Sequence, residues 1–177
     1  MLPKLTLVLG GAASGKSAWA ENLVLGGTQS PVYLATAQAW DAEMQAKIER
    51  HRLSRGQGWH TEEAPLELAP ALAQADARQA VLLDCATLWL TNHLLADRDL
   101  DLAAAGLLDA LAACAAPVVV VSNEVGYGIV PDNALSRRFR QAQGELNQKL
   151  AAQAELVVAV MAGLPLVLKG RMPGGMA

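Results

Sequence analysis

Four short apolar runs alternate along the chain with longer segments of helical periodicity, and this alternation constrains the fold more than any other feature. The runs are rich in valine or leucine, as is typical of strands buried on both faces. They cover residues 5–9, 32–35, 80–84 and 117–122. The helical segments cover residues 16–25, 41–54, 66–78, 87–96, 100–115 and 133–153. Strands that alternate with crossover helices pair in parallel, so the pattern predicts an α/β fold with helices on both faces of a mostly parallel sheet.

The C-terminal segment 155–169, ELVVAVMAGLPLVLK, has the pattern of two strands joined by a tight Gly-Leu-Pro turn. Such a pair predicts one antiparallel edge strand at the end of the sheet. The chain has 177 residues, which is the length of one domain. We therefore expect a single domain over residues 1–170 and a frayed tail over 171–177.

Composition excludes several classes of protein. A net charge of −3 lacks the broad basic field that duplex nucleic acid requires, so we expect no nucleic-acid partner. Cys85 and Cys114 lie in apolar runs, which argues against a disulfide framework or a cysteine zinc site and favours a reducing cytoplasm. The N-terminus has the pattern of a first strand, and no apolar stretch reaches about 18 residues. We expect a cytoplasmic protein with no membrane span.

Residues 10–17, GGAASGKS, match the phosphate-loop pattern GxxxxGK[ST]. The motif directly follows a predicted strand and opens a predicted helix, so backbone N–H groups and a helix N-terminus can surround phosphate oxygens. The alternative is a glycine-rich turn with an incidental lysine. If the motif binds a nucleotide, Lys16 reaches the β- and γ-phosphates and Ser17 binds Mg²⁺. The residues expected at the nucleotide are Gly10, Gly11, Ala12, Ala13, Ser14, Gly15, Lys16 and Ser17.

Two acidic residues lie at the ends of predicted strands. Asp84 ends the run AVLLD, at the strand end where open α/β sheets bind ligands, and is the expected second partner of Mg²⁺. Glu124 follows the next run and can orient a water or accept a hydroxyl proton. The alternatives are a turn or helix-cap residue for Asp84 and a solvated loop acid for Glu124. Either carboxylate can serve as the base of a phosphoryl transfer.

A basic helical segment carries His51. Lys47, Arg52 and Arg55 lie near this histidine, oppose its protonation and attract a triphosphate. Attack by a neutral imidazole on phosphorus gives a covalent phosphoramidate and splits a nucleotidyl transfer into two steps. The alternative is a solvated helix face with a surface histidine and basic residues near the helix C-terminus.

Taken together, these motifs resemble the bifunctional adenosylcobinamide kinase / adenosylcobinamide-phosphate guanylyltransferase family of cobalamin biosynthesis. The phosphate loop is generic, whereas the HR motif followed by a Trp and the segment SNEVGYGIVP with its downstream Asn and Arg residues are specific to this family. The similarity covers the chain to about Lys169.

The resemblance implies a P-loop NTPase with a RecA-like sheet, assembled as a homotrimer, that performs two reactions. ATP or GTP phosphorylates adenosylcobinamide, and GMP from GTP is then transferred to adenosylcobinamide phosphate, giving adenosyl-GDP-cobinamide. The guanylylated histidine of the family falls on His51, its phosphate and metal positions fall on Lys16 and Ser17, and Asp84 matches a position that the family fills with an acid. The expected catalytic residues are therefore His51, Lys16, Asp84 and Glu124.

Two positions depart from the family pattern. Ala13 stands where the family often has Arg, and Gly56 stands where Pro is common. The first change removes a cation near the phosphates, and neither removes a group of the covalent chemistry.

Two other functions are compatible with the motifs: a small-molecule kinase in which His51 only binds phosphate, and a binding module that uses Arg137, Arg138 and Arg140.

Overall fold

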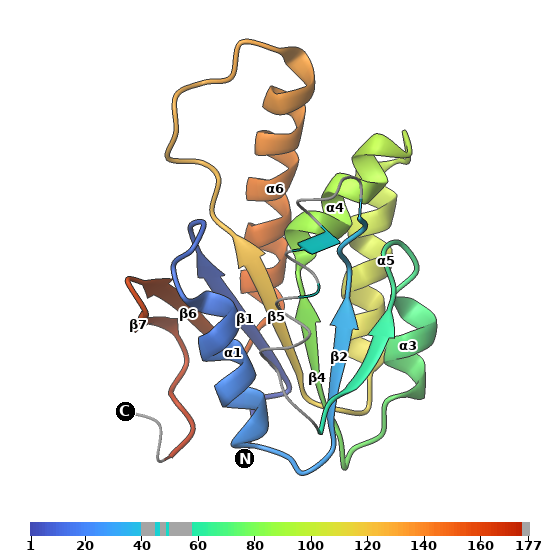
Figure 1. Ribbon diagram of the computed structural model, residues 1–177, viewed down its shortest axis with the longest axis vertical. Helices are drawn as coiled ribbons and strands as arrows, with labels where there is room; N and C mark the ends of the chain where they lie inside the picture. The colour runs from blue at the N-terminus through green and yellow to red at the C-terminus, as the bar shows by residue number, and fades with distance from the viewer. Residues whose placement is uncertain (40–44, 47–48, 50–57, 175–177) are drawn as a thin grey trace.

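The computed structural model describes residues 1–39, 45–46, 49 and 58–174, and its strands form one seven-stranded sheet (Figure 1). The strand order is β3-β2-β4-β5-β1-β6-β7. All neighbours pair in parallel except β6 and β7, which are antiparallel. The strands are β1 (Leu5–Gly10), β2 (Pro31–Ala35), β3 (His60–Glu63), β4 (Ala80–Asp84), β5 (Val118–Asn123), β6 (Leu156–Met161) and β7 (Leu164–Lys169). The predicted α/β class and its antiparallel C-terminal edge strand are confirmed.

Two details of the sheet differ from the sequence prediction. Strand β3 was not predicted, because its sequence HTEE is polar and mostly exposed and it pairs only with β2. The turn between β6 and β7 consists of Ala162 and Gly163, with φ of 52° and 79°, rather than Gly-Leu-Pro. Two consecutive positive φ angles suit a tight two-residue hairpin. Pro165 lies within β7, where an edge strand tolerates it.

The helices that the structure describes match the predicted segments, although one of them is clearly shorter than predicted. The structure describes α1 (Lys16–Leu25), α3 (Ala69–Gln74), α4 (Ala86–Leu95), α5 (Leu100–Ala113) and α6 (Ala134–Gln153). Helix α3 is shorter than the predicted 66–78, because Ala75 is extended and Asp76 forms a turn with Arg78 and Gln79. The helix predicted over 41–54 lies outside the described residues, apart from 45–46 and 49.

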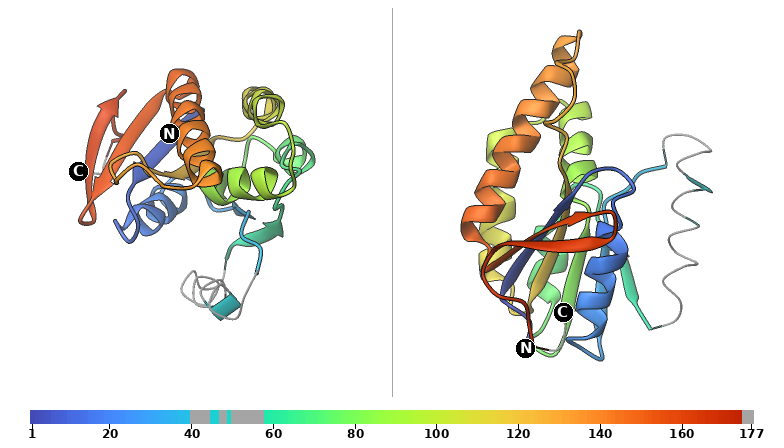
Figure 2. Two further views of the ribbon diagram at one scale, coloured as in Figure 1. Left: turned by 90° about the horizontal axis from the view of Figure 1, so that it is seen from above. Right: turned by 90° about the vertical axis from the view of Figure 1, so that its left-hand side faces the viewer.

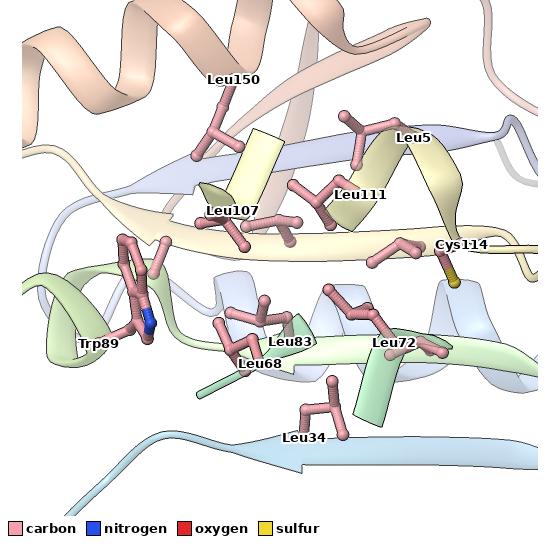
Figure 3. Packing of buried hydrophobic residues seen from close by; sticks show 14 of the residues in the cluster. Leu5, Leu34, Leu68, Leu72, Leu83, Trp89, Leu107, Leu111, Cys114 and Leu150 are labelled. Atoms are coloured by element: carbon pink, nitrogen blue, oxygen red, sulfur yellow. The ribbon is translucent and has the colours of Figure 1, made fainter. Parts of the chain in front are cut away.

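Helices cover both faces of the sheet (Figure 2). Alternating strand residues point to opposite sides, as in Leu7 and Val8 of β1. Val8 belongs to the cluster that packs on α1, whereas Leu7 belongs to the larger cluster that packs on α3, α4, α5 and α6. Figure 3 shows part of the larger cluster, including Leu83, Leu107 and Leu150. Burial on both faces explains the continuous apolar runs of the central strands.

The sheet ends at Lys169, and Met172 packs against the cluster on the α1 face. The predicted domain bounds, 1–170 with a tail from 171, stay a prediction. Within the part of the chain that the structure describes, no helix has both the length and the apolar character needed to cross a membrane.

Candidate functional site

The carboxyl ends of β1, β5 and β4 lie side by side, and the predicted site residues of these strands gather at this edge (Figure 1). Gly10 at the end of β1 pairs with Asn123 of β5, and Asp84 at the end of β4 pairs with Val121 of β5. Strand β5 therefore separates the phosphate loop from Asp84. Ligands of open α/β sheets bind beyond the carboxyl ends of the strands.

The phosphate loop turns sharply between β1 and α1. Gly15 adopts a left-handed conformation with φ of 91°, and α1 starts at the next residue. The Lys16 side chain is buried and donates a hydrogen bond of 3.0 Å to the Gly11 carbonyl oxygen, so its ammonium group lies across the loop. Gly11, Ala12 and Ala13 are exposed. The N–H groups of a first helical turn have no partners within the helix, so this end of α1 can receive an anion.

Asp84 is half-buried and held by the neighbouring strand. The Tyr33 hydroxyl, from β2, donates a hydrogen bond of 2.9 Å to Asp84 Oδ2. The next residue is fixed by the buried Thr36, whose hydroxyl accepts from the Cys85 N–H and donates to the Cys85 carbonyl, each at 2.8 Å. Asn92 in turn donates to the Thr36 carbonyl at 2.8 Å. These contacts determine the direction in which the chain leaves β4.

Electrostatics link Lys16 to the end of β4. Burial raises the pKa of the Cys85 thiol to about 11, and the Asp84 carboxylate acts in the same direction. The Lys16 ammonium opposes this rise, so its charge acts at the end of β4 as well as across the phosphate loop. Cys85 is therefore a buried neutral thiol and not a nucleophile at neutral pH.

Glu124 lies directly beside the phosphate loop. Its main-chain N–H donates to the Gly10 carbonyl oxygen at 3.1 Å, which extends the pairing of β5 with β1 by one residue. Its carboxylate Oε1 accepts a hydrogen bond of 2.8 Å from the Gly126 N–H. The Gly126 carbonyl accepts from Arg140 of α6. The side chain is thus held at the start of the loop that joins β5 to α6.

A buried polar network attaches the end of β5 to α4 and α6. Ser122 donates to Asn147 Oδ1 at 2.6 Å, and Gln143 donates to both of them, at 2.9 and 3.0 Å. Asn147 also donates to the Asn123 carbonyl at 3.1 Å, and the Asn123 N–H donates to the Thr87 hydroxyl at 2.8 Å. Because Asn123 is the partner of Gly10, this network supports the start of the phosphate loop.

The structure brings together only part of the predicted site. The phosphate loop, Asp84 and Glu124 meet at one edge of the sheet. The positions predicted for guanylyl transfer and triphosphate attraction lie outside the described residues; they are Lys47, His51, Arg52 and Arg55.

Sequence reasoning missed several supporting residues. The missed residues are Tyr33, Thr36, Asn92, Ser122, Gln143 and Asn147. The sequence could have indicated that Gln143 and Asn147 are buried. They are four residues apart, on the helix face that also carries the buried Leu146 and Leu150. Of the three arginines named for a binding module, Arg137 and Arg140 donate to loop carbonyls, and that module stays an untested alternative.

The chemistry of the donors suits Mg²⁺. Ser17 supplies a hydroxyl and Asp84 a carboxylate, both half-buried at the carboxyl edge of the sheet. Among the described residues there is no group of three or more His, Cys, Asp or Glu side chains that could enclose a metal. Mg²⁺ commonly binds through one or two protein oxygens together with substrate phosphates and waters, so two oxygen donors beside a phosphate loop fit this ion.

A family model and two relatives with matching descriptions are similar to this chain over most of its length. The family model described as cobinamide kinase / cobinamide phosphate guanyltransferase matches residues 6–168. The bifunctional adenosylcobalamin biosynthesis protein CobP of Pseudomonas aeruginosa is 46% identical over 167 residues, covering 93% of this chain and 96% of that protein. The bifunctional adenosylcobalamin biosynthesis protein CobU of Escherichia coli is 40% identical over 181 residues, covering 93% and 99%.

Solved structures with low sequence identity share the fold of this chain. The RadB recombinase has a TM-score of 0.57 at 18% identity, covering 99% of this chain and 86% of that one. A prototypical ATPase from a type III secretion system also has a TM-score of 0.57, at 9% identity, covering 94% and 57%. The expected RecA-like P-loop NTPase fold is confirmed.

Proposed function

The chain belongs to the cobinamide kinase / cobinamide phosphate guanyltransferase family, and from this membership we propose that it catalyses two successive reactions of cobalamin biosynthesis. In the first, ATP or GTP phosphorylates adenosylcobinamide. In the second, GMP from GTP is transferred to adenosylcobinamide phosphate, giving adenosyl-GDP-cobinamide and pyrophosphate.

One observation carries the kinase half of the proposal: the phosphate loop and two carboxylates share the carboxyl edge of the sheet. The aminopropanol hydroxyl oxygen attacks the γ-phosphorus, the bond to the bridging oxygen breaks, and the nucleoside diphosphate leaves. Lys16 and the loop N–H groups hold the phosphates in line, and this positioning supplies much of the rate. We assign proton acceptance to Glu124, because Asp84 already accepts from Tyr33 and is the better metal ligand.

Mg²⁺ is the proposed cofactor, with Ser17 and Asp84 as its protein ligands. When bound, it neutralises negative charge on the triphosphate. The Tyr33 hydroxyl orients the Asp84 carboxylate toward this role, because it occupies one of the two carboxylate oxygens.

The transferase half rests on family membership and on His51. A ring nitrogen attacks the α-phosphorus of GTP, the bond to the bridging oxygen breaks, and pyrophosphate leaves from around Lys16. Lys47, Arg52 and Arg55 attract the triphosphate to this position. An oxygen of the cobinamide phosphate then attacks the same phosphorus, and the electron pair of the broken P–N bond returns to the imidazole. A covalent guanylyl-histidine predicts ping-pong kinetics.

We further propose a homotrimer in the cytoplasm. Strand β7 supports assembly, since it is an edge strand whose Leu164, Leu166, Val167 and Leu168 are 71%, 55%, 40% and 57% exposed. An exposed apolar patch on an edge strand is typical of a surface that binds another chain. The two free, buried cysteines suit a reducing compartment.

The deciding experiment uses GTP labelled at the α-phosphorus. Purified wild-type protein and the His51→Ala variant are each incubated with this GTP and Mg²⁺, denatured, and assayed for acid-labile label on the protein. Separately, γ-labelled ATP measures phosphorylation of adenosylcobinamide. We expect label on the wild type, none on His51→Ala, and phosphorylation by both.

Other outcomes separate the alternatives. No protein-bound label on the wild type with phosphorylation intact indicates the small-molecule kinase. Label that persists in His51→Ala contradicts the assignment of this histidine. Absence of both activities contradicts the proposed function as a whole.

A further inference from the structure

The loop that joins β5 to α6 is held at both ends by arginines of that helix, and Figure 1 shows it beyond the end of β5. Near its start, Arg140 donates to the Gly126 carbonyl. Near its end, Arg137 Nη1 donates to the carbonyls of Pro131 and Asp132, at 2.9 and 2.7 Å. The two arginines are three residues apart and share a face of α6.

Gly126 is held from two sides. Its carbonyl accepts from Arg140, and its N–H donates to Glu124 Oε1 at 2.8 Å. Glu124 itself is bonded through its main-chain N–H to Gly10, the first residue of the phosphate loop. A continuous set of hydrogen bonds therefore runs from Arg140 through Gly126 and Glu124 to the phosphate loop.

We propose that Arg140 is a positioning residue for phosphoryl transfer. By fixing Gly126, it fixes the N–H that holds one oxygen of the Glu124 carboxylate, and so directs the other oxygen toward the attacking hydroxyl. This inference rests on the proposed function, with Glu124 as the proton acceptor. In this role Arg140 acts through the peptide groups of Gly126.

The guanidinium of Arg140 is only partly paired within the described part of the chain. Arg140 Nη1 is buried and, within the part of the chain that the structure describes, has no hydrogen-bond partner. A buried donor without an acceptor opposes folding. The hydrogen bond to the Gly126 carbonyl is one that a lysine ammonium can also make.

The test compares kcat and KM of adenosylcobinamide phosphorylation among matched variants. For Arg140→Ala we expect kcat to fall about 10- to 100-fold, because a catalytic group displaced by about 1 Å costs this much. The KM for ATP should change less than about threefold, since the phosphate loop keeps its own contacts. Arg140→Lys should recover most of the loss.

A second variant tests the same contact from the other side. A Cβ on Gly126 would lie 2.8 Å from Glu124 Oε1, so Gly126→Ala must push the carboxylate aside while leaving Arg140 in place. Glu124 Oε1 is the end of a flexible side chain and can move away, so the fold should tolerate the change. We expect the same fall in kcat as for Arg140→Ala.

Two arginines of the same helix serve as controls. Arg138 is exposed, and Arg137 binds the far end of the loop. Arg138→Ala and Arg137→Ala should each keep kcat within about threefold of wild type. Guanylylation of the protein by α-labelled GTP should be unchanged in every variant, because Glu124 takes no part in that step.

The outcomes separate this inference from the proposed function. If the wild type phosphorylates adenosylcobinamide and Arg140→Ala keeps its kcat, only the role of Arg140 is wrong. An equal fall in both activities, or an Arg137→Ala variant as impaired as Arg140→Ala, indicates general ordering of the loop and also overturns the role. A wild type without kinase activity contradicts the proposed function first, and the inference with it.

Discussion

The N–H of Gly163, in the turn between β6 and β7, donates a hydrogen bond of 2.8 Å to the carbonyl oxygen of Ser14 in the phosphate loop. The C-terminal hairpin therefore forms one wall of this loop. The contact is close, since a Cβ on Gly15 would lie 3.0 Å from the Gly163 Cα, and one on Gly10 would lie 2.7 Å from the Val160 carbonyl oxygen. Gly15 is required here for its positive φ and for this approach.

Gly15→Ala should lower both stability and nucleotide affinity. The left-handed φ of 91° costs a residue with a Cβ about 1–2 kcal/mol, and the approach to Gly163 adds to this. We expect the free energy of unfolding to fall by about 1–3 kcal/mol in urea titrations, and the Kd for a fluorescent GTP analogue to rise at least about tenfold. Gly11→Ala is the control for stability alone, because its Cβ would meet nothing within 4 Å whereas the residue belongs to the phosphate loop. An equal loss of stability in the two variants would contradict the role given to Gly15.

Asp84→Asn should increase the requirement for Mg²⁺. The substitution keeps the size of the side chain and removes the negative charge proposed to bind the ion. We expect the Mg²⁺ concentration for half-maximal phosphorylation to rise about tenfold or more, and kcat to fall about 100-fold. Tyr33→Phe removes only the hydroxyl that donates to Asp84, so its kcat should fall less than about tenfold. A normal Mg²⁺ dependence in Asp84→Asn would exclude this residue as a ligand.

Asn147→Ala should destabilise the fold through the buried network. The truncation removes the acceptor of Ser122 and the donor to the Asn123 carbonyl, leaving buried polar groups unpaired. We expect a loss of about 2–3 kcal/mol in the free energy of unfolding, measured by urea denaturation. The matched control is Gln141→Ala on the exposed side of the same helix, expected within about 0.5 kcal/mol of wild type. A similar stability of both variants would show that the network contributes little.

His93 should make the fold less stable in mild acid. Burial lowers the pKa of its imidazole below the ordinary value of 6.5, outweighing the contact of its Nε2 with the Leu66 carbonyl. As pH falls through 6.5 the unfolded chain takes up a proton that the folded chain does not, so stability falls until the lower folded pKa is reached.

Thermal unfolding checks this directly. Between about pH 7.5 and about pH 5.5, the Tm of wild type should fall more than that of His93→Gln. His60→Gln, at an exposed position of β3, is the control and should follow wild type. The same pH dependence in wild type and His93→Gln would rule out this histidine as the source.

Leu166→Glu should weaken the proposed trimer. A charge on the exposed apolar face of β7 opposes its burial against another chain. Light scattering after size exclusion should give a trimer for wild type and a lower mass for Leu166→Glu. Leu102→Glu, at a position of α5 that is 73% exposed, should leave the mass unchanged. A monomeric wild type would contradict the trimer itself.

The sequence by itself determined the features that depend on contiguous residues. The runs that form β1, β2, β4 and β5 are apolar because both faces of the sheet are covered. Burial on both faces requires consecutive apolar residues, so these strands can be recognised from the local sequence alone. The phosphate loop is also contiguous, since strand, glycines, lysine and helix start follow one another from Leu5 to Ser17. The residues around His51 stay a prediction from sequence and family.

Only the tertiary structure decided how separate segments meet. The order of the strands puts β5 between β1 and β4, which brings Glu124 against Gly10 and sets Asp84 one strand away. Strand β3 escaped prediction because its residues are polar, so that backbone hydrogen bonds to β2 hold it in the sheet and its sequence has no apolar pattern. The contacts of Tyr33 with Asp84, Arg140 with Gly126 and Gly163 with Ser14 join residues distant in the chain, and a distant pairing of polar groups carries no local signal.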